Sequence, residues 1–198
     1  IFNIPDREEL NYENYFLTVS RIEKSKNVFR TIKAVENLYF KNELKGYQFI
    51  VAGKGVEYYE AQKYVKQKKL CDIIKLKGFV SEEEKNSLYK NAAFCIYIPF
   101  DEPFGLVCLE SFAYRKAIIA SNHAGTSETV RDKKEGLLIN PENSNEIEDA
   151  IINMINNKEQ TKKFGENGYN RLMENFLFSH FIQRFLDLIE NKLLSSKR

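Results

Sequence analysis

The sequence has 198 residues, of which 43% are hydrophobic and 29% are charged, a composition typical of a soluble globular protein with a substantial core. It excludes a disordered, a collagen-like and a coiled-coil chain. Lysine and arginine number 30 against 28 aspartate and glutamate residues, so the net charge of only +2 argues against nucleic-acid binding. No apolar run approaches the roughly 20 residues of a membrane-spanning helix.

Cysteine and histidine are sparse. Cys71, Cys95 and Cys108 are widely spaced and form no CxxC pair, which favours reduced thiols in a cytoplasmic protein over a disulfide framework. Only His123 and His180 could serve as imidazole ligands or catalysts, so no metal site is predicted. The chain has no signal peptide and opens without an initiator methionine, which we interpret as a fragment of a longer protein.

Short apolar runs alternate with longer amphipathic stretches along most of the chain. The apolar runs cover residues 16–19, 47–51, 73–76, 94–98, 117–120 and 136–139. After the first run, Val28, Ile32, Val35 and Leu38 recur at helical spacing. Such alternation is typical of a parallel sheet covered on both faces. We therefore predict an α/β fold with a Rossmann-like, doubly wound parallel sheet of about six strands.

The strand pattern stops at Pro141, and three C-terminal helices are predicted over residues 144–157, 159–175 and 178–194. Ser144 and Ser179 are the expected N-caps of the first and the last of these helices. The last helix carries an apolar stripe that must be buried against another surface. Its members are Phe181, Ile182, Phe185, Leu188, Ile189 and Leu193.

The loop after the fourth strand is the first candidate site, because ligands bind beyond the carboxyl ends of parallel strands. Glu102 precedes a turn at Gly105 and a nearly all-apolar helix that contains Glu110. A carboxylate in a buried helix needs a cation or a polar ligand, and sugar or ribose hydroxyls suit it. The N–H groups of Gly105 and Leu106 at the helix start suit a phosphate. Alternatively, Glu110 pairs with a basic residue and Glu102 is solvated.

The loop after the first strand carries Arg21 and Lys26, just before a helix that begins near Asn27. A guanidinium fork and a mobile ammonium group together suit a diphosphate. The alternative is a solvated loop in which Arg21 binds Glu23, and these residues alone favour that alternative.

Two further loops give weaker signals. Residues 53–55, Gly-Lys-Gly, match neither a Walker loop nor a complete GxGxxG pattern. After the fifth strand, Gly125 and Thr126 are expected to offer backbone N–H groups to a ligand, and Thr126 or Ser127 to cap the next helix. The lysines of residues 66–69 are interpreted as a solvated helix face.

Taken together, the loops resemble those of the retaining GT-B glycosyltransferases of family 4, the group 1 glycosyl transferases. Residues 102–110 are similar to the E-x7-E motif of that family, and residues 16–26 to its strand and phosphate loop. The resemblance covers essentially the whole chain but only the C-terminal half of such enzymes. The departures from the family pattern are Ser20, Asn27, Arg115 and Ala124 in place of glycine, and Ala117 in place of proline.

The resemblance implies a role for each matching position. Arg21 and Lys26 would bind the diphosphate of a nucleotide-sugar, and with Glu102, which would contact the donor sugar, they would be the catalytic residues. Glu110 would hold the ribose hydroxyls. The other implied substrate-binding positions are Gly105, Leu106 and Val107 for sugar and phosphate, Gly78, Phe79 and Val80 beside the nucleobase, and Gly53, Gly125 and Thr126 along the cleft.

The resemblance also implies a reaction and a domain arrangement. A sugar would pass from a UDP- or GDP-linked donor to an acceptor hydroxyl with retention, with no metal and no further cofactor, in surface polysaccharide or glycolipid synthesis. Residues 1–14 would be an interdomain linker, residues 15–177 the nucleotide-sugar-binding domain, and residues 178–198 a helix and tail that cross to a missing N-terminal acceptor domain. This fragment alone would be inactive.

The remaining expectations concern partners, location and alternative functions. The last helix could instead pair two copies of the fragment, and the full enzyme would work in the cytoplasm or at the inner face of the cell membrane. Another GT-B enzyme, such as a nucleotide-sugar epimerase, is an alternative that the Glu102–Glu110 spacing disfavours. A non-catalytic Rossmann-like binding domain is the other alternative.

Overall fold

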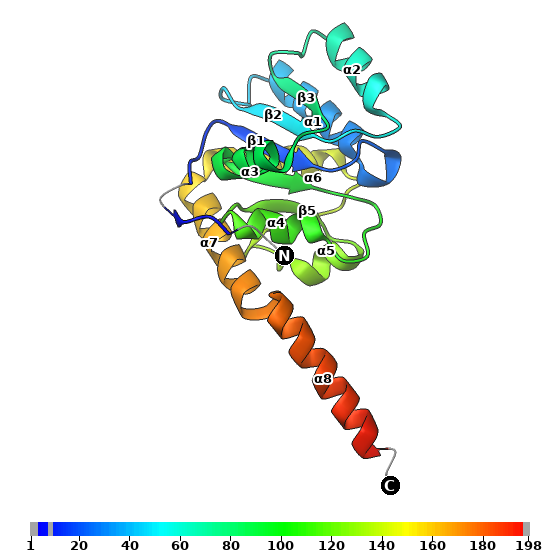
Figure 1. The fold of residues 1–198 in the computed structure, drawn as a ribbon. Helices are drawn as coiled ribbons and strands as arrows, with labels where there is room; N and C mark the ends of the chain where they lie inside the picture. Colours follow the sequence, from blue (N-terminus) through cyan, green and yellow to red (C-terminus); the bar gives the residue numbers. More distant parts are fainter. Residues whose placement is uncertain (1–3, 8–9, 196–198) are drawn as a thin grey trace.

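The computed structural model describes residues 4–7 and 10–195, with the side chains of the last helix described as far as Ile189. Six parallel strands form one sheet in the order β3-β2-β1-β4-β5-β6 (Figure 1). The strands are β1 (Tyr15–Val19), β2 (Gln48–Ala52), β3 (Ile74–Gly78), β4 (Phe94–Tyr97), β5 (Ile118–Ser121) and β6 (Gly136–Ile139). The predicted doubly wound, Rossmann-like sheet is confirmed.

Helices follow the strands and cover both faces of the sheet (Figure 1). They are α1 (Val28–Phe40), α2 (Tyr58–Gln67), α3 (Glu82–Asn91), α4 (Leu106–Ala113), α5 (Ala124–Thr129), α6 (Ser144–Asn156), α7 (Lys158–Asn175) and α8 (Phe178–Ser195), with a short 3-10 helix, η2 (Lys24–Lys26). Side chains of α1, α2 and α6 build the core on one face, and those of α3 and α4 build it on the other.

Aromatic side chains fill the centre of the first core. Phe16 stacks between Phe49 and Phe94, with ring centroids 5.0 and 5.1 Å apart. On the opposite face α7 packs closely on α4 because Gly168 has no side chain, and a Cβ there would lie 2.3 Å from the ring of Phe112. Both faces of β1, β2, β4 and β5 are therefore buried, which explains why these strands read as nearly continuous apolar runs.

Three positions where the resemblance expects glycine keep a left-handed backbone without it. Asn27 has φ 59°, Arg115 has φ 52° and Ala124 has φ 49°. Asparagine tolerates this conformation, whereas for other residues it costs roughly 1–2 kcal/mol. Arg115 is held there by an ion pair with Glu166 at 2.7 Å. The substitutions therefore leave the glycine-type turns in place.

The three C-terminal helices are confirmed as α6, α7 and α8, but their predicted caps are wrong. The side chain of Asn143, not Ser144, caps α6 by accepting from the N–H groups of Asn145 and Glu146. Because α8 begins at Phe178, Ser179 lies inside its first turn. Asparagine and serine are almost equally good N-caps, so the sequence did not distinguish adjacent candidates.

Helix α8 extends away from the sheet and its covering helices (Figure 1). The described members of its apolar stripe are exposed, with Phe181 at 57%, Phe185 at 52% and Leu188 at 57%. Leu193 and residues 1–3 and 8–9 of the predicted linker lie outside what the structure describes. Among the described helices, none combines the length and apolar character needed to cross a bilayer.

Candidate functional site

The loops that follow the strands meet at the carboxyl edge of the sheet. Gly105 has φ 85° and stands at the N-cap of α4. The N–H of Phe100 donates to the carbonyl of Ser25 at 3.0 Å, and the N–H of Gly125 donates to the carbonyl of Glu102 at 2.8 Å. These bonds join the loops after β1, β4 and β5, as the topology predicts.

Glu102 and Lys26 form the centre of this loop cluster. The Lys26 ammonium lies 2.8 Å from the Glu102 carboxylate, and only 18% and 16% of the two side chains are exposed. The Tyr97 hydroxyl donates to the same carboxylate, and the Gly105 N–H donates to it at 3.4 Å. Burial alone would raise the pKa of Glu102, but the hydrogen bonds from Lys26 and Tyr97 outweigh it and hold that pKa below its ordinary value. Glu102 is therefore not the solvated loop residue of the alternative hypothesis.

Glu110 has a similar set of partners on α3. Its carboxylate lies 3.2 Å from the Lys85 ammonium and accepts from the Tyr89 hydroxyl at 3.0 Å. Burial would lower the pKa of Lys85, but its contacts with Glu82 and Glu110 leave that pKa raised. The lysine partner foreseen in the alternative hypothesis is thus present. A hydroxyl-bearing ligand would have to share Glu110 with Lys85 or displace it.

Arg21 does not join this centre. Its side chain is 71% exposed and pairs with Glu23 at 3.2 Å, as the solvated-loop alternative predicts. Lys26 points inward, because Asn27 turns the chain at the start of α1. The structure therefore separates the two cations that the sequence placed together.

Gly53 sets the spacing between the loops after β1 and β2. A Cβ at Gly53 would lie 2.0 Å from the carbonyl oxygen of Ser20, and its φ is 138°. The Gly53 N–H also donates to the carbonyl of Gly78 at 2.7 Å. Gly53 thus lets the loops after β1, β2 and β3 approach each other at the edge of the cluster.

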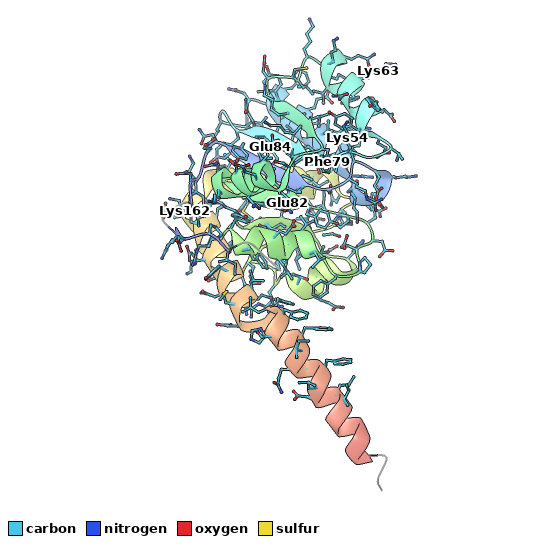
Figure 2. All side chains as sticks on the ribbon, in the orientation of Figure 1. Lys54, Lys63, Phe79, Glu82, Glu84 and Lys162 are labelled. Carbon is cyan, nitrogen blue, oxygen red and sulfur yellow. The ribbon has the colours of Figure 1, made fainter. Side chains whose placement is uncertain are left out.

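The remaining predicted positions have side chains that are either exposed or half-buried. Phe79, labelled in Figure 2, is 83% exposed and Leu106 is 59% exposed, so both side chains are accessible. Val80 and Val107 are half-buried.

The loop before α5 differs from its prediction. The Thr126 hydroxyl is buried and donates to the carbonyls of Ser121 and His123. The Ser127 hydroxyl donates to the carbonyl of Ala124. Neither residue caps α5, because His123 occupies the N-cap position. The Gly125 N–H donates to the backbone carbonyl of Glu102, so Gly125 connects this segment to the loop before α4.

Three functional candidates were missed by reasoning from the sequence: Tyr97, Tyr89 and Lys85. Tyr97 ends a buried strand at the carboxyl edge, where a phenol hydroxyl needs a polar partner, and that is the signal that could have identified it. Lys85 and Tyr89 are four residues apart on one face of α3. Nothing local shows that this face meets α4. Among the described residues, no three His, Cys, Asp or Glu side chains are grouped so as to hold a metal ion.

Comparison with known proteins identifies sequence relatives. The model of the family Glycosyl transferases group 1 matches residues 2–171. An uncharacterized glycosyltransferase of Methanocaldococcus jannaschii is 32% identical over 171 residues, which cover 85% of this chain and 46% of that protein. The alpha-1,3/1,6-mannosyltransferase ALG2 of Dictyostelium discoideum is 29% identical, over 96% of this chain and 49% of its own. The chain therefore spans about half the length of these curated relatives.

Solved structures share the fold. Staphylococcus aureus TarM, in a complex that includes UDP, has a TM-score of 0.83 at 22% identity, over 94% of this chain and 37% of its own. A C-terminal domain of a group 1 glycosyl transferase family protein (LpcC) from Francisella tularensis has a TM-score of 0.74 at 24% identity, over 86% of this chain and 90% of its own. The described chain thus has the GT-B type of Rossmann-like fold.

Proposed function

The chain belongs to the group 1 glycosyl transferases, and from that premise we propose that it is the nucleotide-sugar donor-binding domain of a retaining glycosyltransferase. The observation that carries the proposal is the contact between Lys26 and Glu102, with Glu110 eight residues further on at the same edge of the sheet. A cation beside a carboxylate, next to a helix N-terminus, provides sites for a diphosphate and a sugar hydroxyl side by side.

In the proposed reaction, the bond between the sugar's anomeric carbon and the diphosphate breaks, and the diphosphate leaves with the electron pair. The acceptor hydroxyl forms the new bond to the anomeric carbon and gives its proton to the departing diphosphate oxygen. Lys26 stabilises the departing charge, and no metal or cofactor takes part. Arg21, whose side chain is 71% exposed, reaches the diphosphate by leaving Glu23.

The two glutamates bind the donor at two different points. Glu110 accepts from the ribose hydroxyls and shares its carboxylate with Lys85, whose ammonium stays 3.2 Å away. The Tyr97 hydroxyl holds the Glu102 carboxylate in place. Glu102 accepts a hydrogen bond from a hydroxyl of the donor sugar. The accessible Phe79 flanks the nucleobase together with Gly78 and Val80.

The longer enzyme would include an acceptor-binding domain that this chain lacks, since the chain spans about half of its relatives. A mannosyltransferase of O-antigen chains in Escherichia coli is among those relatives, at 27% identity over 93% of this chain and 48% of its own. We infer a role in surface polysaccharide or glycolipid synthesis, in the cytoplasm or at the inner face of the membrane.

Calorimetric titration of the chain with UDP, GDP and ADP tests donor binding. We expect saturable binding of one nucleotide, lost in Glu110→Ala and kept in Glu82→Ala, which removes a carboxylate from the same lysine outside the motif. Lys26→Ala is expected to weaken binding at least about tenfold, whereas Lys24→Ala, an exposed neighbour, leaves it unchanged.

A folded sample that binds none of the three nucleotides contradicts the proposal and favours a non-catalytic binding domain. Equal losses in Glu110→Ala and Glu82→Ala would place the ribose elsewhere.

A further inference from the structure

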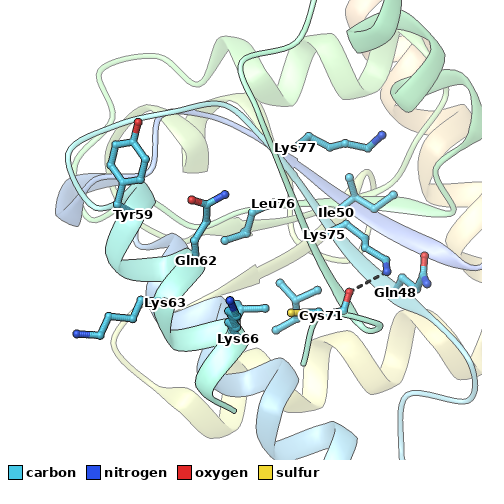
Figure 3. A pocket seen from close by; sticks show the side chains of 12 residues that line it. Gln48, Ile50, Tyr59, Gln62, Lys63, Lys66, Cys71, Lys75, Leu76 and Lys77 are labelled. Atoms are coloured by element: carbon cyan, nitrogen blue, oxygen red, sulfur yellow. Dashed lines mark hydrogen bonds between the residues drawn. The ribbon is translucent and has the colours of Figure 1, made fainter. Parts of the chain in front are cut away.

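A groove at the free edge of the sheet lies outside the site described above. Strand β3 has β2 as its only sheet neighbour, so its other edge is unpaired by any described strand. A cavity of about 930 Å³ runs along this edge. Figure 3 shows its two sides, with Tyr59, Gln62, Lys63 and Lys66 on α2 and Lys75 and Lys77 on β3.

The groove carries positive charge above an apolar floor. Lys63, Lys66, Lys75 and Lys77 line it, and no aspartate or glutamate is among its lining residues. Lys63 and Lys66 have no ion-pair partner among the described residues. Lys77 pairs weakly with Glu84 at 3.3 Å, both side chains being more than 40% exposed. Ile74 and Leu76 form the apolar floor beneath α2, whereas Ile50 lies on the face of Lys75.

Successive side chains of β3 point to opposite faces of the sheet, so its lysines lie on one face and its apolar side chains on the other. Lys75 pairs in register with Ile50, and Leu76 pairs with Val51, so Lys75 and Leu76 point to opposite faces of the sheet. A strand added at this edge would direct alternate side chains toward Lys75 and Lys77, and the others toward the apolar floor beneath α2. The charge pattern therefore specifies a segment that alternates acidic and apolar residues.

From this geometry we propose that the edge of β3 binds an extended acidic segment of a partner protein by strand addition. A second copy of this chain is a poor occupant, because pairing two β3 edges would bring their lysines onto one face, where like charges repel. A membrane surface is flat and cannot enter the groove or pair with the strand edge. Exposed lysines also protect edge strands against aggregation, and that role alone predicts no selective binding.

Fluorescence anisotropy of a labelled peptide of alternating glutamate and valine tests the proposal. We expect saturable binding, weakened at least about tenfold in Lys75→Glu/Lys77→Glu, because these two lysines lie on the face that the glutamates of the added strand reach. The matched control Lys133→Glu/Lys134→Glu changes the net charge equally at two exposed lysines before β6, and should bind as the parent does. Circular dichroism verifies that each variant is folded, and Lys75→Gln/Lys77→Gln replaces the first variant if it does not fold.

Two probes distinguish strand addition from simple charge attraction. A peptide with the same glutamates but proline at alternate valines cannot pair as a strand, and is expected to bind at least about tenfold more weakly. Three results would overturn the proposal. They are equal binding of the proline peptide, no saturable binding of the glutamate–valine peptide, and binding of phosphatidylglycerol vesicles alone. Nucleotide titration of the groove variants should remain as in the parent, so failure here does not bear on the donor site.

Discussion

At the residue scale, two tyrosines and two lysines hold the two glutamates of the site. Tyr97 and Lys26 contact Glu102, while Tyr89 and Lys85 contact Glu110. A carboxylate with both a cation and a hydroxyl donor is fixed in position, and for Glu102 these partners also lower the pKa. Such partners hold each carboxylate in one position before any ligand binds. Tertiary packing alone brings these partners to the two glutamates.

Tyr97→Phe should remove a hydroxyl donor from Glu102 while leaving the ring in the core. We expect the free energy of unfolding at pH 7 to fall by about 1–2 kcal/mol. Because the folded-state pKa of Glu102 is below its ordinary value, its contribution to stability is full above that ordinary pKa and is lost as pH falls through the folded pKa. The deficit of the variant should therefore shrink in acid. Urea unfolding at pH 7 and pH 3 measures it.

The control for this prediction is Tyr39→Phe, because Tyr39 is 42% exposed and outside the site. This variant should match the parent at both pH values. A Tyr97→Phe deficit that is equal at pH 7 and pH 3 would show that the hydroxyl does not act through Glu102.

Lys116 is a buried titratable group far from the site. Its ammonium donates to the Asn11 carbonyl and lies 3.8 Å from the Tyr12 ring centroid, and burial lowers its pKa to about 7. Between pH 7 and the ordinary lysine pKa of about 10.4, the unfolded chain binds a proton that the folded chain does not. The free energy of unfolding therefore rises with pH across this window.

Substitution of Lys116 removes this pH dependence. From pH 7 to pH 10 the stability of the parent relative to Lys116→Met should rise by about 2–4 kcal/mol, measured by urea unfolding. Lys134→Met replaces an exposed lysine. Its free energy of unfolding should change with pH as that of the parent does. A parallel profile for Lys116→Met as well would mean that Tyr12 and Asn11 keep the ammonium charged throughout.

At the element scale, the strands and most helices follow from hydrophobic periodicity, because burial on both faces of the sheet requires apolar runs. The N-caps of the helices could not be predicted from the sequence, because asparagine and serine have similar N-cap preferences and Asn143 and Ser144 are adjacent. The site was predictable only in part. Lys26 and Glu102 were placed by topology, whereas the outward turn of Arg21 and the approach of α3 to Glu110 depend on tertiary packing.

Gly53→Ala tests how closely the loops must approach. The new Cβ would lie 2.0 Å from the Ser20 carbonyl, so either the backbone shifts or the loop after β1 opens. We expect a loss of stability of about 2–4 kcal/mol and weaker nucleotide binding. Gly46→Ala is the matched control, because Gly46 also has positive φ, at 81°, but no atom lies within 4 Å of a Cβ there. It should cost only about 1 kcal/mol and leave binding unchanged; equal costs would contradict the close approach.

At the scale of the whole molecule, helix α8 carries an exposed apolar face. Phe178, Phe181, Phe185 and Leu188 are each more than half exposed, which is unusual for large apolar residues arranged on one helix. We propose that the acceptor domain of the longer protein covers this face, and that two copies of the chain pair through it when that domain is absent.

This pairing predicts a concentration-dependent dimer in sedimentation equilibrium. Phe181→Asp/Phe185→Asp should be monomeric and should melt at the temperature that the parent shows when dilute and monomeric, because neither side chain is buried in the described core. Gln183→Asp/Arg184→Asp, at neighbouring exposed polar positions, should still dimerise. A parent that stays monomeric at all concentrations would contradict the pairing.

A crystal structure of the chain with the nucleotide selected by titration tests most directly whether a nucleoside diphosphate binds at Lys26, Glu102 and Glu110. We expect that the Lys26 ammonium contacts the diphosphate, that the ribose hydroxyls donate to Glu110, and that Phe79 lies beside the base. A nucleotide bound elsewhere, with the 2.8 Å contact between Lys26 and Glu102 unchanged and no ligand on Glu110, would contradict this expectation.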